Sequence, residues 1–203
     1  MTARRGMARL WSPWRMAYIS KAGPAARPRA RTAAAPRSRG PSAADDAGCL
    51  FCRVGAGDDD RLDLVLARLG CAMLMLNRFP YNPAHLMVAV TRHAAAIGDL
   101  TDAERRDLLE LTALAERALE AEYHPHGLNY GANSGRVAGA GFPGHLHLHL
   151  VPRWDGDTNF MPVIGETRVL PESLGQTWTR LRRAIRGLKR SAPRTGGRRG
   201  ARR

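Results

Sequence analysis

Apolar and polar residues alternate along the chain with two periodicities, that of a strand in some segments and that of a helix in others. Apolar runs at residues 63–69 and 71–77 meet at Gly70, which predicts a hairpin. A third run, at residues 85–91, follows a turn rich in proline and asparagine. Two more strands are predicted at residues 127–133 and 145–151. A sheet of about five strands is therefore expected.

Two other segments have helical spacing and a recognisable start. Thr101 and Glu104 form a capping box before a mostly apolar face that ends at Pro125. Ser173 and Gln176 cap a second helix near the end of the chain. The two faces consist of Leu108, Leu111, Ala115, Ala118 and Glu122 in the first helix and Leu174, Trp178, Leu181, Ile185 and Leu188 in the second.

These elements predict the α+β class, with one antiparallel sheet covered on one side by a long helix and a C-terminal helix. The domain is expected over residues 48–188. Before it, an aromatic segment with Trp11 and Trp14 is expected to dock on the domain or on a partner subunit, because exposed tryptophan is unfavourable. The edge of such a sheet can pair with a second copy, so a homodimer is expected.

The positive charge is concentrated at the two ends of the chain. Residues 1–47 carry ten Lys or Arg and two Asp, and residues 180–203 carry eleven and no acid, whereas residues 48–179 are acidic. The basic stretches are rich in Pro, Ala, Gly and Arg, so residues 1–47 are expected to include a disordered linker and residues 189–203 to form a disordered tail. They lack the interleaved aromatic residues of an RNA-recognition module, so only weak nucleic-acid contact is expected.

Neither a membrane span nor an export signal is expected. No apolar run is long enough to cross a bilayer, and the charged start has no apolar stretch of secretory length. The three cysteines, Cys49, Cys52 and Cys71, are an odd number, and two of them have C-x-x-C spacing. This usage fits a reducing compartment better than a disulfide framework, so a cytoplasmic location is expected.

The segment GHLHLHLVPRW, at residues 144–154, has a histidine at every second position. In a strand, His145, His147 and His149 share one face and the leucines between them enter the core, whereas a helix would scatter them over about 200°. A polar solvent face is the simplest alternative, but three aligned histidines among the chain's seven favour a functional cluster. Imidazoles can attack, transfer protons or bind metal, and spacing alone leaves these open.

The segment before this strand, NSGRVAGAGFPG, is rich in glycine. Glycine lets backbone amides approach and cradle an anion, as in phosphate-binding nests. An ordinary flexible connection is the alternative. Beside a histidine strand, phosphate chemistry is the favoured interpretation.

The strand HLHLHLV resembles the His-φ-His-φ-His-φ-φ signature of the histidine triad family of nucleotide hydrolases and transferases. LNRFPYNPAHLMVAVTRH is similar to the first substrate-binding segment of that family, and residues 127–163 are similar to its catalytic half. With LWSPWRM near the start, the likeness is greatest to the bacterial branch that phosphorolyses diadenosine tetraphosphate. The likeness covers about residues 9–20 and 48–188, without the basic insert between them.

This resemblance implies a role for each matching residue. His147 would attack the α-phosphorus and form a nucleotidyl-histidine intermediate, which water or inorganic phosphate would then cleave. His149 would contact the phosphate or the leaving-group oxygen, and His85 would complete the cluster. Asn77 would contact the ribose and Asn133 the phosphate. The backbone amides that would stabilise the phosphate charge belong to Gly139, Gly141 and Gly144.

The chain departs from the pattern of the family at two places. Family hydrolases usually carry Gln and Ser or Thr where this chain has Gly141 and Phe142, so backbone groups would have to replace those side chains. The frequent proline at the end of the first substrate-binding strand is Val90 here, which is expected to change little.

The pair Cys49-Leu-Phe-Cys52 is compatible with a metal site, a redox pair or simple burial. The redox interpretation expects a helix start in a thioredoxin-like βαβ unit, which the pattern does not show. Some histidine triad relatives, including galactose-1-phosphate uridylyltransferase, bind structural zinc through such a pair and two histidines. That likeness implies His93 and His145 as the other ligands of a closed tetrahedral zinc site. His126, like its neighbour His124, is expected at the surface or at a helix cap.

The resemblance implies an enzyme that cleaves dinucleoside polyphosphates, such as diadenosine tetraphosphate, by phosphorolysis or hydrolysis. Hydrolysis of nucleoside phosphoramidates or adenylates on the same fold is one alternative. A non-catalytic nucleotide-binding protein, a nucleic-acid-binding scaffold and a zinc-dependent hydrolase remain further alternatives. The last would need an open metal coordination position.

Overall fold

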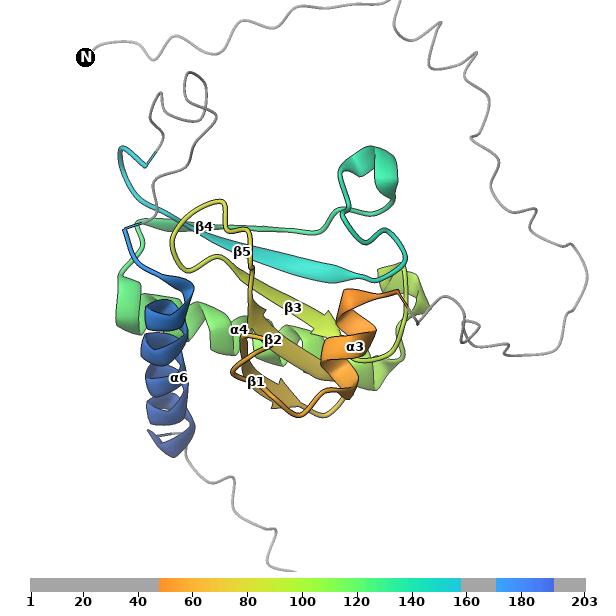
Figure 1. Cartoon of the computed structure of the whole chain (residues 1–203), viewed down its shortest axis with the longest axis horizontal. Helices are drawn as coiled ribbons and strands as arrows, with labels where there is room; N and C mark the ends of the chain where they lie inside the picture. The colour runs from red at the N-terminus through yellow and green to blue at the C-terminus, as the bar shows by residue number, and fades with distance from the viewer. Residues whose placement is uncertain (1–47, 158–170, 192–203) are drawn as a thin grey trace, which may run out of the picture. The chain divides into compact units, whose positions relative to one another are not determined.

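The computed structural model describes residues 48–157 and 171–191, which form one α+β unit (Figure 1). Trp11 and Trp14 and most of the basic stretches lie outside these residues. In chain order, the elements are α3 (Leu50–Ala56), β1 (Val65–Leu69), β2 (Ala72–Leu76), β3 (Leu86–Val90), the short 3-10 helix η1 (Ile97–Asp99), α4 (Asp102–Tyr123), β4 (Gly127–Gly131), the short 3-10 helix η2 (Arg136–Ala138), β5 (His147–Arg153) and α6 (Leu174–Ser191).

The five strands form one antiparallel sheet in the order β1-β2-β3-β5-β4. Their register aligns one row of residues across four strands, because Val65 pairs with Met75, Met75 with Met87, and Met87 with His149. The histidine strand therefore lies inside the sheet, between β3 and the edge strand β4. Met75, Met87 and His149 of this row line the candidate site.

The two faces of the sheet are covered by different helices. On β2, Leu74 and Leu76 point into the core formed with α4 and α6, whereas Met73 and Met75 point into a smaller core formed with α3. In Figure 1, α3 lies in front of the sheet and α4 behind it. This separation follows from the alternation of side chains along a strand. The site develops on the α3 face.

Both long helices begin where the capping patterns predict. Thr101 Oγ1 accepts a hydrogen bond from the Glu104 amide, and the Glu104 carboxylate accepts one from the Thr101 amide at 2.8 Å. Ser173 and Gln176 form the same reciprocal pair before α6. His124 ends α4 in the left-handed conformation, in agreement with the predicted cap. α6 continues to Ser191, three residues past the predicted end of the domain, because its last turn carries Lys and Arg that favour a helix C-terminus.

The predicted α+β fold, with an antiparallel sheet, a long helix and a C-terminal helix, is confirmed. The pattern did not predict α3, a helix of only seven residues whose first residue follows Cys49. As a result, the sheet carries a helix on its second face as well. Within the described ranges, no helix has both the length and the apolar character needed to cross a bilayer.

Candidate active site and metal cluster

The three triad histidines lie on the α3 face of the sheet, as the alternation predicts. β5 begins at His147, and His145 lies just before it. Leu146 and Leu150 point to the opposite face, into the core under α4 and α6. The Phe51 ring of α3 packs against two of the imidazoles, with centroid distances of 5.1 Å to His145 and 4.6 Å to His147.

One hydrogen bond determines which nitrogen of His147 is available for attack. Its Nδ1 lies 2.8 Å from the backbone oxygen of His145. Because a carbonyl oxygen only accepts hydrogen bonds, Nδ1 carries the proton and the neutral ring keeps the lone pair on Nε2. Burial lowers the pKa of His147 below its ordinary value of 6.5, which favours this neutral form at physiological pH.

The tautomers of His85 and His149 are determined in the same way. The Tyr81 backbone amide donates to His85 Nδ1 at 3.1 Å, so the proton of neutral His85 is on Nε2. His85 Nε2 lies 3.0 Å from His149 Nδ1 and donates to it. The neutral His149 ring therefore presents Nε2–H as a donor. Burial, and then repulsion from His147, lowers the pKa of His149.

A pocket of about 370 Å³ opens beside these rings. His147 and His149 line it from β5, Asn77 lines it from the end of β2, and α3 forms one of its walls. Asn77 also lies next to the histidines, because its Nδ2 is 3.4 Å from His85 Nδ1. A largely apolar pocket with a few polar groups converging on it is the usual form of a small-molecule site.

The glycine-rich loop closes one side of the same pocket. Asn133, Gly139 and Gly141 are in its lining, and Asn133 Nδ2 donates to the Gly139 oxygen at 3.4 Å. Gly139 has a φ of +89°, which L side chains rarely adopt. Gly144 lines a neighbouring cavity instead and lies against the His93 ring. The glycine-rich loop therefore borders both the histidine pocket, through Gly139 and Gly141, and the cavity beside His93, through Gly144.

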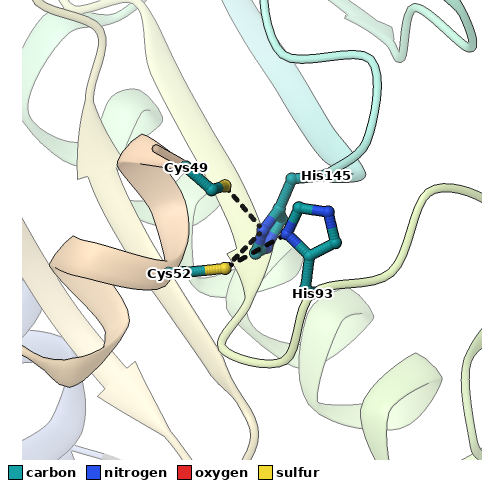
Figure 2. A group of neighbouring side chains, drawn as sticks. All are labelled: Cys49, Cys52, His93 and His145. Carbon is teal, nitrogen blue, oxygen red and sulfur yellow. Dashed lines mark hydrogen bonds between the residues drawn. The ribbon is translucent and has the colours of Figure 1, made fainter. Parts of the chain in front are cut away.

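Cys49, Cys52, His93 and His145 converge at the N-terminal end of α3 (Figure 2). One ligand atom from each lies within 4.8 Å of the other three. The Sγ of Cys52 is 3.2 Å from His93 Nδ1 and 3.5 Å from His145 Nδ1, and the Sγ of Cys49 is 3.3 Å from the same His145 nitrogen. A tetrahedral metal with two thiolates and two imidazoles needs sulfur–nitrogen separations of about 3.6 Å.

The chemistry of these donors fits a metal. His145 Nε2 lies 2.8 Å from the Val90 oxygen, so this nitrogen carries the proton and Nδ1 keeps its lone pair toward the two sulfurs. An outer hydrogen bond of this kind usually orients a histidine that binds metal. Gly144 allows the close approach of the other imidazole, because a Cβ there would lie 2.9 Å from His93 Nε2. The four residues can hold a metal ion.

Comparisons with known proteins agree with this geometry. The family model of the HIT domain matches residues 63–156. The chain is 38% identical to an AP-4-A phosphorylase of Mycobacterium tuberculosis over 86% of this chain and 82% of that protein. The chain belongs to the histidine triad (HIT) family. It is also 30% identical to the adenosine 5'-monophosphoramidase hnt1 of Schizosaccharomyces pombe, over 52% of this chain and 74% of the relative.

Solved structures show the same fold. A Zn-bound histidine triad family protein of Mycobacterium smegmatis has a TM-score of 0.57 and 23% identity, over 71% of this chain and 98% of that one. A histidine triad nucleotide-binding protein of Sulfolobus tokodaii also has a TM-score of 0.57, with 20% identity, over 73% and 99% of the two chains.

The structure of this HIT protein brings most of the predicted site residues together. The two asparagines and two of the glycines line the pocket with His147 and His149, and His85 lies directly behind His149. The four predicted metal ligands form the neighbouring cluster. The C-x-x-C pair does lie at the start of a helix. The strands of the domain form an antiparallel sheet, however, and not a thioredoxin-like βαβ unit.

Sequence reasoning did not identify two residues that shape the site. Phe51 lies inside the C-x-x-C pair and packs on the triad, and Asp63 lines the far part of the pocket before β1. The only signal for Phe51 was a large aromatic residue between two candidate metal ligands. No local pattern distinguishes Asp63 from the three aspartates just before it.

Proposed function

We propose that this HIT protein is an enzyme that cleaves dinucleoside polyphosphates, such as diadenosine tetraphosphate, through a nucleotidyl-histidine intermediate on His147. The observation that carries the proposal is the unprotonated Nε2 of His147 beside the Nε2–H of His149 in one pocket. The 38% identity to an AP-4-A phosphorylase supports the same substrate class.

In the first step, His147 Nε2 attacks the α-phosphorus. A phosphorus–nitrogen bond forms, the phosphoanhydride bond breaks, and the nucleoside polyphosphate leaves with the electron pair of that bond. His149 is positioned to donate its Nε2 proton to the leaving oxygen, and His85 holds His149 in the tautomer that can do so. The covalent step divides one difficult displacement into two easier ones.

In the second step, inorganic phosphate or water attacks the same phosphorus and restores His147. With diadenosine tetraphosphate, phosphate gives ADP and ATP, and water gives AMP and ATP. Asn77 contacts the ribose and Asn133 the phosphate side. Because Gly141 and Phe142 replace the polar side chains usual in family hydrolases, backbone amides of the loop stabilise the phosphate charge.

The decisive experiment measures the products from diadenosine tetraphosphate with and without inorganic phosphate. We expect ADP and ATP when phosphate is present, and a loss of at least about a thousandfold in turnover for His147→Ala. His126→Ala, an exposed histidine outside the pocket, is the matched control. Native turnover by His147→Ala would overturn the mechanism.

Hydrolysis of nucleoside phosphoramidates is the second candidate activity, and the S. pombe relative favours it. It uses the same attack by His147 but releases an amine instead of a nucleoside polyphosphate. Comparing kcat/KM for adenosine 5'-phosphoramidate and diadenosine tetraphosphate decides between the two. Binding of both without turnover of either would indicate a non-catalytic nucleotide-binding protein.

We propose that the metal of the Cys49, Cys52, His93 and His145 cluster is a structural zinc ion. Four nitrogen and sulfur ligands complete a tetrahedral shell and leave no open position for catalysis. When bound, zinc would connect the start of α3 to the segment that follows β3, through His93, and to the segment that precedes β5, through His145. We expect about one zinc per chain by elemental analysis, and loss of this zinc in Cys52→Ser.

We also propose a cytoplasmic homodimer. β4 is an edge strand with Tyr130 half exposed, so the sheet can extend into a second copy there. Reduced cysteines, which metal binding requires, favour the cytoplasm. Sedimentation velocity tests the dimer, and cell fractionation tests the location. Weak nucleic-acid contact through the basic ends remains a prediction about residues mostly outside the described ranges.

A further inference from the structure

The pocket runs across the sheet from the histidines toward β1. His149, Met87 and Met75, which pair in one register row, line the pocket, and the row continues to Val65 of β1, beside the lining residues Leu64 and Asp63. Three strand spacings separate the ends of this row, or about 14 Å. This span is of the order of an extended nucleoside monophosphate, so a nucleotide with its phosphorus at His147 places its base near the start of β1.

The walls at this far part of the pocket are mainly apolar. Leu50 and Val54 of α3 face Leu64 and Met75 of the sheet side, and Phe79 adds an exposed aromatic ring. Flat apolar rings are stabilised by burial between such side chains. The apolar walls favour the base over the ribose or phosphate at this position.

Asp63 is the buried acid in this apolar part. The residue is only 7% exposed, and its Oδ1 accepts a hydrogen bond from Arg53 at 2.9 Å. Within residues 48–157 and 171–191, Oδ2 of Asp63 has no hydrogen-bond partner. In the described part of the chain, every fully buried side-chain oxygen has a hydrogen-bond partner. Because Oδ2 has none, it is not fully buried and solvent reaches it. Oδ2 lies beside Gly57 at the end of α3, and Asp63 itself lines the pocket, so the carboxylate can accept a hydrogen bond from a group bound at this end.

We propose that Asp63 selects nucleotides whose base carries an exocyclic amino group, as adenine does. This inference rests on the proposed function, because that function places the phosphorus at His147. The ionised carboxylate only accepts hydrogen bonds, so it pairs with an amino group and repels a keto oxygen. Arg53 holds the carboxylate by Oδ1 and leaves Oδ2 to the base.

AMP and IMP are the matched probes. AMP has an amino group on carbon 6, whereas IMP has a keto oxygen there and a proton on the neighbouring ring nitrogen. Calorimetry with the full, zinc-loaded chain should give a Kd for AMP at least about tenfold below that for IMP, because IMP has a keto oxygen where AMP has the amino group, and a carboxylate facing that position repels the oxygen. Asp63→Asn should reduce this ratio at least about fivefold, because the amide can also donate to a keto oxygen.

Two further variants separate recognition from structural support. Asp60→Asn makes the same change three residues earlier, at an acid that binds Arg68 and Arg182 outside this pocket, and should keep the native ratio. Arg53→Gln removes the ionic partner but retains the carboxylate, so AMP should still bind more tightly than IMP. If the Asp63–Arg53 pair were only structural, Arg53→Gln and Asp63→Asn would weaken both nucleotides equally.

The outcomes distinguish this inference from the proposed function. Equal affinities for AMP and IMP, or an unchanged ratio in Asp63→Asn, would overturn the role of Asp63 while turnover of diadenosine tetraphosphate still supports the catalytic proposal. If the native chain binds neither nucleotide and cleaves no substrate, the proposed function fails and this inference fails with it.

Discussion

The rings of Phe51 and His147 are stacked, with their centroids 4.6 Å apart and their planes 28° from parallel. Phe51 lies in α3, and the two cysteines of the metal cluster flank it in the sequence. Cys52 of α3 and Cys49 just before the helix are candidate metal ligands, and the ring between them in the sequence packs on the proposed nucleophile. We therefore expect metal binding to affect the orientation of His147, because Phe51 and the two cysteines lie within one turn of chain.

Replacing this ring should affect the reaction more than the fold. Phe51→Leu keeps an apolar side chain but loses the flat contact with His147, so we expect kcat to fall by about tenfold. The free energy of unfolding should fall by only about 1–2 kcal/mol, because much of the buried volume is kept. Steady-state kinetics and urea unfolding measure the two effects. Exposed Leu109→Ala is the control, and a native kcat in Phe51→Leu would contradict the link.

The donor from His85 to His149 should matter through the tautomer of His149. His85→Leu removes the donor to Nδ1, so His149 no longer keeps its proton on Nε2, and kcat should fall by at least about tenfold. His85→Gln retains an N–H group that can reach the same nitrogen and should recover part of the loss. The pH dependence of kcat in both variants provides the measurement. Identical rates for them would exclude a role of this hydrogen bond.

Gly144 should control metal retention. In Gly144→Ala, the new Cβ would lie 2.9 Å from His93 Nε2, so the imidazole must shift away from its position beside Cys52. We expect faster zinc loss in competition with a coloured chelator and a Tm lower by a few degrees. Gly98→Ala, where a Cβ would meet nothing within 4 Å, is the control. Equal zinc loss in the two variants would contradict the steric argument.

Glu104 should make stability depend on acid pH. The hydrogen bonds from Arg92 lower its pKa from the ordinary value of 4.5 to about 2. Below pH 4.5 the unfolded chain binds a proton that the folded chain does not, so the free energy of unfolding falls with pH until about pH 2. The loss is at most about 3 kcal/mol, and solvent around the half-exposed Arg92 reduces it.

Glu104→Gln isolates this effect from that of the other carboxylates. Urea unfolding of both chains between pH 7 and pH 3 should show the native chain losing more stability than the variant. The difference in free energy should be largest at neutral pH and shrink in acid. Curves that stay parallel over this range would show that the Arg92–Glu104 pair contributes no pH-dependent stability.

Local sequence patterns predicted most of the fold because they repeat over several residues. Alternation placed His147 and His149 on one face and Leu150 on the other, and the capping box at Thr101 located the start of α4. The short α3 was missed because seven residues are too few for a helical period to emerge. The histidine triad was recognisable because a histidine at every second position is the spacing that puts three imidazoles on one face of a strand.

By itself, the sequence determined that an extended backbone aligns the triad histidines and that a glycine-rich loop precedes them. Only the tertiary structure decided which nitrogen of each ring carries the proton, because those hydrogen bonds come from the His145 carbonyl and the Tyr81 amide. It also placed Asp63, just before β1, in the same pocket as His147 and His149. Such relations depend on strand pairing between distant segments, and no local period in a chain encodes them.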